Sequence, residues 1–436
     1  MKRAFLIFLV IATLLFSALP FPRPINAKMH LDTNIEVQTL PIETFKGTMK
    51  IETFASPDCS YAALIETLNS TNTSLFIEMY SFSHPYILDV IGNLSVKGVN
   101  IIIILQKNHA SYFENNYTYW VAWQLYQRNV HVYWANSTEF RYTHAKFVII
   151  DNKTIIVESE NWAKLGIPKN PTYGNRGWGI IIENTDVADY FLDVFLYDLS
   201  IATPYSTSES HGTSVSYTVP SGSYKPKFNV ESFNEYVEVI PVFSPDFSEN
   251  LIIQLINSAN VSLYIEQMYI YSSLTDIVNA IISAKQRGVD VKIILDPRST
   301  QNNQTAQMLL PYNISMAYAN TSEYPSPHAF ETMHNKGMII DGKIVLISSI
   351  NWSPTSLRDN REAGVIVKNA HIAQYYQDIF DYDWQQAKEY LSGGGEAPPG
   401  EETPETSWWE TPTGQIILLG VALILVIVIA FIKKKL

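Results

Sequence analysis

Two kinds of apolar stretch alternate along the middle of the chain. Short runs rich in β-branched residues predict strands, at 74–79, 101–105, 144–150 and 154–159. Longer stretches whose apolar positions recur every three or four residues predict helices, for example at 61–68 and 274–287. The alternation of strands and helices indicates a chain of the α/β class.

The same pattern is used twice. Three pairs of segments match in sequence: 54–58 with 243–246, 74–78 with 262–266, and 97–101 with 287–291. We therefore predict two tandem modules, at 48–204 and 231–391, related by a pseudo-twofold axis. Residues 205–230, rich in Ser, Thr, Tyr and Gly, are expected to form a linker or an excursion near the site.

One polar motif recurs in register in the two modules. Its positions are His, Lys, Asp, Ser, Asn and Trp, and each one is shifted by 190 residues in the second copy. The two copies are His144, Lys146, Asp151, Ser159, Asn161 and Trp162, and His334, Lys336, Asp341, Ser349, Asn351 and Trp352. A single His two residues before a Lys is ordinary, but six recurring positions indicate a shared function.

Each motif is predicted to fold as a hairpin. Asp341 and Gly342 favour a two-residue turn, and Asp151 and Asn152 stand at the same place in the first copy. Pairing outward from such a turn gathers the His, Lys, Ser and Asn of each copy on one face of the hairpin. The same count sends Glu158 and Glu160 to the opposite face, away from the site.

These side chains suit a tetrahedral oxyanion. Lysine supplies positive charge, asparagine and serine supply neutral donors, and histidine titrates near neutrality. Two such sets facing each other would place one imidazole on either side of a phosphorus atom. One His would then attack the phosphorus, while the other would protonate the leaving oxygen and later activate water. That chemistry requires no metal ion or other cofactor.

The two motifs resemble the signature of the phospholipase D superfamily, and the resemblance spans roughly residues 51–384. It implies an α/β/α fold in each module, a single active site at their interface and a phosphohistidine intermediate. The roles that it implies are as follows: His144 is the nucleophile, His334 is the general acid, Lys146, Lys336, Asn161 and Asn351 hold the phosphate, and Asp151 and Asp341 are structural.

The chain departs from the family pattern at two places. Glu158 stands where the family usually has a small residue before the motif Ser. Family members also often carry an acid just after an Asn-Arg pair, which orients a His. Glu362 fits that place in the second module, whereas Gly177 occupies it in the first. The two histidines are therefore expected to be tuned differently.

The ends of the chain predict an exported protein held at a membrane. In residues 1–27 two basic residues at the start precede an uncharged apolar run, which is typical of a signal peptide, although an uncleaved anchor is the alternative. Residues 416–432 are uncharged and apolar, long enough for one transmembrane helix, and three lysines follow them. A Gly/Pro/Glu-rich stretch, 392–415, is expected to be a disordered tether. The catalytic modules would then lie on the extracellular side.

Charge bears on the substrate. The net charge of −12 weighs against extended duplex DNA, because an acidic body repels a polyanion. We therefore favour a membrane-anchored phosphodiesterase acting on phospholipids. The alternatives are a secreted nuclease for single strands with the same mechanism and, third, a non-catalytic phosphate-binding protein. Hydrolysis and transfer to an alcohol both start from the same phosphohistidine, and no feature of the sequence predicts the oligomeric state.

Overall fold

The computed structural model describes residues 40–214, 217–321 and 330–389, and those from Ile42 onward belong to one compact unit. The signal peptide expected at 1–27, the tether at 392–415 and the transmembrane helix at 416–432 lie outside the described residues. Among the helices that are described, none is both long and apolar enough to cross a membrane.

The two modules share one order of strands and helices, to which the second module adds the short elements η1 and α9. The first contains β1 (Phe45–Ser56), α2 (Ser60–Asn69), β2 (Ser74–Met79), α3 (Pro85–Val96), β3 (Asn100–Leu105), α4 (Tyr112–Gln127), β4 (His131–Trp134), β5 (Lys146–Ile150), β6 (Thr154–Glu158), β7 (Gly177–Glu183), α5 (Thr185–Ile201) and β8 (Thr203–Pro204). The second contains β9 (Glu231–Ser244), α6 (Ser248–Ser258), β10 (Ser262–Gln267), α7 (Thr275–Gln286), β11 (Asp290–Leu295), α8 (Thr300–Leu309), the 3-10 turn η1 (Leu310–Tyr312), β12 (Ser315–Tyr318), β13 (Lys336–Ile340), β14 (Ile344–Ser348), α9 (Pro354–Arg358), β15 (Glu362–Lys368), α10 (Ala370–Gln386) and β16 (Lys388–Glu389). The expected α/β class is confirmed.

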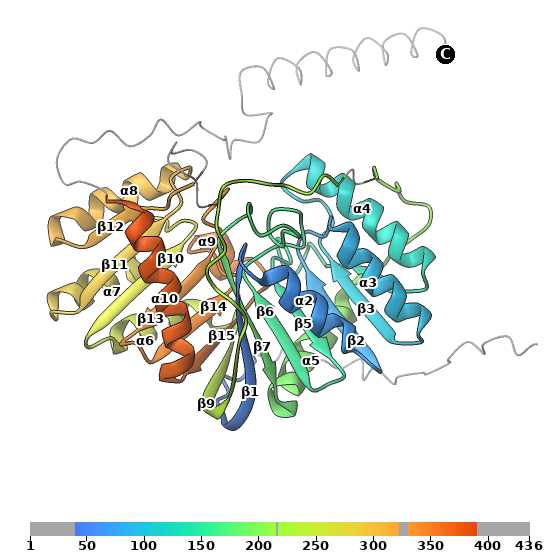
Figure 1. Cartoon of the computed structure of the whole chain (residues 1–436), viewed down its shortest axis with the longest axis horizontal. Coiled ribbons are helices and arrows are strands. Elements are labelled where there is room, and N and C mark those ends of the chain that lie inside the picture. Colours follow the sequence, from blue (N-terminus) through green and yellow to red (C-terminus); the bar gives the residue numbers. More distant parts are fainter. Residues whose placement is uncertain (1–39, 215–216, 322–329, 390–436) are drawn as a thin grey trace, which may run out of the picture. The chain divides into compact units, whose positions relative to one another are not determined.

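One sheet runs through both modules (Figure 1). Its strand order is β16-β12-β11-β10-β13-β14-β15-β9-β1-β7-β6-β5-β2-β3-β4-β8, and the two halves of this order correspond element by element. The antiparallel pair β1 and β9 joins them in the middle. Within each module β2 and β3, or β10 and β11, are parallel and largely buried, as expected for strands with helices on both faces.

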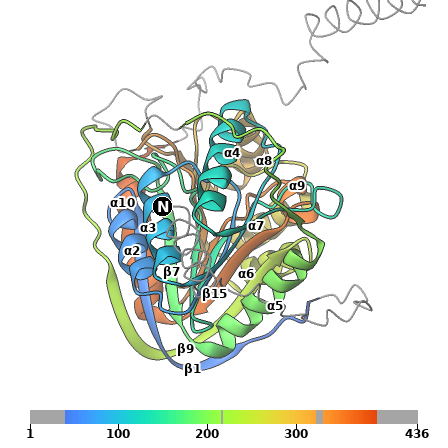
Figure 2. The same ribbon diagram turned by 90° about the vertical axis from the view of Figure 1, so that its right-hand side faces the viewer.

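The last helix of each module also packs on the other module. In α5, the Phe191 ring lies 5.0 Å from that of Phe243 on β9. In α10, the Tyr376 ring lies 5.0 Å from that of Trp178 on β7, and its hydroxyl donates to the Gly179 carbonyl at 2.8 Å. Figure 2 shows α10 and α5 from a second direction. These contacts bury apolar surface of both modules in one core.

The two motif hairpins form, but their turns are one residue longer than expected. Ile150 pairs with Thr154, and Ile340 pairs with Ile344, so each loop holds three residues instead of two. Asp151 and Asn152 adopt positive φ, as do Asp341 and Gly342, and the following Lys is the extra residue. An extra residue shifts the register by one position, and such a shift exchanges the two faces of a strand.

Candidate active site

Each motif histidine is held by the backbone of the opposite module. The backbone N–H of His144 donates to the backbone carbonyl of Arg361 at 2.7 Å. The backbone N–H of His334 donates to the backbone carbonyl of Arg176 at 2.9 Å. The histidines stand two residues before Lys146 and Lys336, the first residues of the central strands β5 and β13. The backbone pairing therefore brings both motifs to the junction of the two modules.

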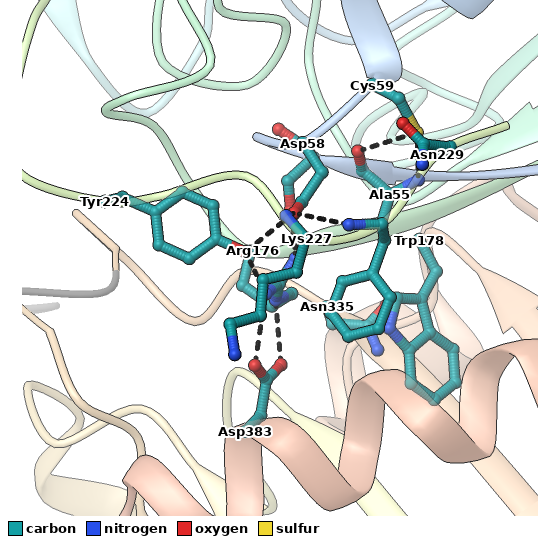
Figure 3. A network of polar contacts seen from close by, with 12 residues as sticks. Ala55, Asp58, Cys59, Arg176, Trp178, Tyr224, Lys227, Asn229, Asn335 and Asp383 are labelled. Atoms are coloured by element: carbon teal, nitrogen blue, oxygen red, sulfur yellow. Dashed lines mark hydrogen bonds and ion pairs between the residues drawn. The ribbon is translucent and has the colours of Figure 1, made fainter.

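The same two arginines clamp the modules together through their side chains. Buried Arg176 pairs with Asp58 of its own module at 2.7 Å and with Asp383 of α10 in the other module at 2.8 Å (Figure 3). The Tyr224 hydroxyl, from the segment between the modules, also donates to Asp58, at 2.7 Å.

A matching clamp surrounds the second arginine. Arg361 pairs with Asp246 of its own module at 2.6 Å and with Asp198 of α5 in the first module at 2.9 Å. Both guanidinium groups are buried and each has two carboxylate partners, as buried charges require. The two clamps thus set the geometry of the two histidines from both sides.

His144 is paired with a carboxylate of the other module. Its Nδ1 lies 2.8 Å from Oε2 of fully buried Glu362. Burial lowers the pKa of His144 to about 4, the Glu362 carboxylate opposes this shift, and the charges of Lys146 and Lys336 lower the pKa further. With Nδ1 engaged by Glu362, Nε2 is left as the nitrogen for chemistry.

Glu362 is itself held by several donors. The Ser349 hydroxyl donates to its Oε2 at 2.6 Å, the Asn360 amide donates to Oε1 at 3.2 Å, and the Ser356 hydroxyl donates to Oε1 as well. Although burial raises it, the net pKa of Glu362 is lowered, chiefly by His144. The role expected for Glu362, orienting a histidine, is matched by this contact with His144.

His334 faces a carboxylate that the sequence count had placed elsewhere. Its Nδ1 lies 3.3 Å from Oε2 of buried Glu160. Burial and the charge of Lys336 lower the pKa of His334, and the Glu160 carboxylate opposes them. The prediction that Glu158 and Glu160 point away from the site is wrong, because the extra turn residue Lys153 shifts the register by one. For the same reason the motif Ser and Asn do not share a strand face with the motif His and Lys.

Glu158 lies beside the motif lysine of its own module. The observed register, continued by one pair, places it opposite Lys146. Its Oε1 accepts a hydrogen bond from the Trp162 indole at 2.7 Å. Burial, reinforced by nearby Glu160, raises the pKa of Glu158 to about 8, against the effects of Trp162 and Lys146. Glu158 therefore holds a proton over part of the neutral range.

Both motif lysines are buried next to their histidines. The Lys146 ammonium donates to the His144 carbonyl at 2.6 Å, and the Lys336 ammonium donates to the His334 carbonyl. Burial lowers their pKa values to about 8 and about 7 respectively, while Glu362 and Glu160 raise both. A bound anion would restore their full charge, because it replaces the lost hydration.

The remaining motif residues divide into two kinds. The Oδ1 atoms of Asn161 and Asn351 are buried and have no hydrogen-bond partner among the described residues, so each amide group can reorient toward a ligand. The Ser349 hydroxyl donates to Glu362, and the Ser159 hydroxyl accepts a hydrogen bond from the backbone N–H of Trp178 at 3.1 Å. Each serine therefore forms its hydrogen bond with a residue of its own module.

The two aspartates brace the hairpin turns. Asp151 accepts the backbone N–H groups of residues 72–74, and Asp341 accepts those of residues 260–262, at 2.7–3.3 Å. Burial opposes the effect, but these donors hold the pKa of each aspartate below its usual value. These contacts agree with the structural role implied for Asp151 and Asp341.

One aromatic residue at the site carries no signal in the sequence pattern. The Tyr80 ring packs edge-on against the His144 ring, with centroids 4.8 Å apart, and the Lys146 ammonium lies 5.6 Å from its centre. Met268 stands at the matching position of the second module, so the surroundings of the two histidines differ. Glu78, on β2, accepts a hydrogen bond from the Thr143 hydroxyl inside the core.

The junction therefore gathers two imidazoles with carboxylate partners and two lysines. Each motif also carries an asparagine, whose –NH2 group can donate to an anion. The histidines and lysines come from both modules, and each of them lies near a titratable residue of the opposite module. Such a set can bind a tetrahedral oxyanion and offer it a nucleophile and a proton donor.

Comparisons with known proteins identify the family to which both modules are similar. Residues 64–199 and 252–384 match the family model described as cardiolipin synthase, PLD-like domain. A probable cardiolipin synthase of Bacillus subtilis is 25% identical over 56% of this chain and 46% of its own length, and a phospholipase D of Rickettsia typhi is 30% identical over 29% and 57%. The chain spans about half the length of these curated relatives.

One solved structure has a similar fold. The phosphatidylserine synthase of Haemophilus influenzae matches with a TM-score of 0.57 and 13% identity, over 79% of this chain and 88% of that one.

Proposed function

We propose that this chain, which belongs to the phospholipase D (PLD)-like domain family matched by both of its modules, is a phosphodiesterase that acts on phospholipids. The observation that carries the proposal is the pairing of each motif histidine with a carboxylate of the opposite module, His144 with Glu362 and His334 with Glu160. In each pair Nδ1 faces the carboxylate, so Nε2 is the atom available to a substrate at the junction.

The reaction proceeds in two displacements at phosphorus. In the first, Nε2 of His144 attacks, a P–N bond forms, and the P–O bond to the leaving alcohol breaks as His334 donates a proton to that oxygen. In the second, His334 takes a proton from water, the water oxygen attacks phosphorus and the P–N bond breaks. An alcohol in place of water would give transfer instead of hydrolysis. Both lysines and both asparagines bind the phosphoryl oxygens, so the mechanism uses no metal ion.

His144 is assigned as the nucleophile because it is the more firmly held of the two. Its contact with Glu362 is a hydrogen bond of 2.8 Å, and Glu362 is fixed by three further donors. A fixed imidazole suits in-line attack, which depends on orientation. His334, 3.3 Å from its carboxylate, is the proton donor and acceptor.

Phospholipids are the proposed substrate class for two reasons. The relatives carry the names cardiolipin synthase and phospholipase D. The net charge of −12 also disfavours a long polyanion. The apolar segment 416–432, followed by three lysines, would hold the enzyme at a membrane with the catalytic modules on the extracellular side. Placement beside a lipid surface fits a lipid substrate.

The test compares two substrates under one set of conditions. The full chain, purified in detergent, is given phosphatidylglycerol vesicles or single-stranded DNA, each with a chelator present. Controls are His144→Ala and His131→Ala, the second being an exposed histidine of β4. We expect headgroup release that His144→Ala abolishes and His131→Ala preserves. Cleavage of DNA with intact lipid would overturn the substrate assignment, and loss of activity with the chelator would overturn the metal-free mechanism.

A further inference from the structure

We propose that Glu160 is the positioning residue for His334 and that it replaces, from the segment that follows β6, the acid that is missing at Gly177. This inference rests on the proposed function, because it assigns how the proton donor of that reaction is held. It makes the two halves of the site chemically alike although their sequences differ.

Gly177 and Glu362 occupy equivalent places in the two modules. Each directly follows an Asn-Arg pair. Gly177 begins β7, which lies next to β1, and Glu362 begins β15, which lies next to β9. Gly177 pairs with Ser56 of β1, and Glu362 pairs with Ser244 of β9. The first module therefore has no side chain at the position from which Glu362 reaches His144.

The side chain of Glu160 fills the space that Gly177 leaves open. A Cβ atom added to Gly177 would lie 2.6 Å from Glu160 Cγ and would also collide with Glu160 Oε1. A Cβ atom at Gly166 would collide first with the backbone carbonyl of Asn161 and would also lie 2.9 Å from Glu160 Oε2. Two glycines thus make room for this carboxylate, whereas the second module has the apolar Ile350 at the position of Glu160.

Equivalent asparagines hold the two carboxylates. The Asn175 amide donates to Glu160 Oε2 at 3.1 Å, and the Asn360 amide donates to Glu362 Oε1 at 3.2 Å. Glu160 is almost fully buried, at 2% exposure, and burying a carboxylate is costly unless it is paired. Its charged neighbours at the site are His334, Lys336 and Lys146, with Glu158 as a second acid.

Glu160 is held less rigidly than Glu362. Its Oε2 lies 3.3 Å from His334 Nδ1, and its Oε1 is buried without a hydrogen-bond partner in the described part of the chain. By contrast, Glu362 also receives the hydroxyls of Ser349 and Ser356. A loosely held carboxylate suits a histidine that gives and then takes a proton, because imidazole and imidazolium require different contacts.

The consequence for the reaction is a change in proton donation. Without the Glu160 charge, burial and the two lysines act unopposed on His334, so its imidazolium form is lost at a lower pH. Substrates with an alkyl alcohol as leaving group need that proton, whereas a nitrophenolate leaves without it. Loss of Glu160 should therefore slow the first substrate far more than the initial release of nitrophenol from the second.

The experiment uses the full chain with Glu160→Gln and with a double variant, Glu160→Ile plus Gly177→Glu, which copies the second module's own pair Ile350 and Glu362. For phosphatidylglycerol we expect Glu160→Gln to lower kcat about 10² to 10³-fold, within the range for general acid catalysis, and to move the alkaline limb of the pH profile to lower pH. The double variant should restore kcat to within about tenfold of wild type, because the acid returns from the equivalent position.

The outcomes separate the inference from the proposed function. A wild-type enzyme that cleaves neither substrate would refute the proposed function. An active wild type whose Glu160→Gln variant keeps its kcat and pH profile would refute only the role of Glu160. A uniform loss on both substrates, with a lowered melting temperature and no recovery in the double variant, would show that Glu160 is merely structural and would likewise overturn the inference.

Discussion

The guanidinium of Arg176 and the carboxylate of Asp383 are in contact across the junction of the two modules, with Nε and Oδ2 2.8 Å apart. Both side chains are buried, and the Arg176 carbonyl accepts the N–H of His334. This pair therefore links the packing of the modules to the position of His334, the proposed proton donor.

Arg176→Met should destabilise the fold and reduce activity together. Removing one partner of a buried ion pair leaves an uncompensated charge, and we expect a loss of about 3–5 kcal/mol in the free energy of unfolding. The measurement is urea unfolding followed by tryptophan fluorescence. Arg358→Met is the matched control, because the Arg358 pair with Glu249 is partly exposed and should cost about 0–1 kcal/mol. Equal losses in the free energy of unfolding for the two substitutions would contradict the stabilising role of the Arg176 ion pairs.

His334→Ala should trap the covalent intermediate on His144. The variant keeps the nucleophile but lacks the base that activates water, so a substrate with a nitrophenolate leaving group should load the enzyme and then stall. Mass spectrometry after an alkaline quench checks whether His144 carries the phosphoryl group with the ester that remains after the nitrophenolate has left. The double variant His144→Ala with His334→Ala should carry none, and turnover by that double variant would refute the mechanism.

Binding of a dianion should take up protons at pH 8. Burial lowers the pKa of Lys336 to about 7 and that of Lys146 to about 8, so Lys336 is mostly neutral at pH 8 in the empty site. A bound tungstate raises both values, and uptake on the order of one proton follows.

The uptake is measured by calorimetry in buffers of different ionisation enthalpy. At pH 6 both lysines already carry their protons, so their contribution disappears. Lys336→Met should reduce the difference between pH 8 and pH 6, and a difference that persists unchanged in this variant would exclude Lys336 as the source.

Asp341→Ala should weaken the fold while leaving the chemistry intact. Asp341 accepts three backbone N–H groups and contacts no motif histidine, so its loss should cost about 1–3 kcal/mol of stability with kcat changed less than threefold. Its pKa is lowered in the folded state, so its contribution to stability is fully present above its unfolded pKa and is lost as the pH falls through its folded pKa.

Thermal unfolding at pH 7 and at acid pH, with Asp89→Ala as an exposed control, measures this effect. The gap between wild type and Asp341→Ala should narrow as the pH falls. A gap that stays constant to acid pH would show that the carboxylate charge is not the stabilising feature.

The repeat, the α/β class and the two hairpins follow from the sequence because they depend on local properties. Strand and helix periodicity, a left-handed turn at Asp341 and Gly342, and a motif repeated at a fixed offset are all readable from neighbouring residues. The residue types at the site were likewise predictable, since His144, Lys146 and Glu362 stand in recognisable patterns.

Only the tertiary structure decided which carboxylate serves which histidine. His144 and Glu362 are 218 positions apart, and their contact depends on how the modules meet across β1 and β9. Glu160 was misplaced for a smaller reason: one extra turn residue, Lys153, exchanged the faces of the strand. Local pattern therefore determined which groups the site contains, whereas the register of one strand and the packing of two modules determined how those groups are paired.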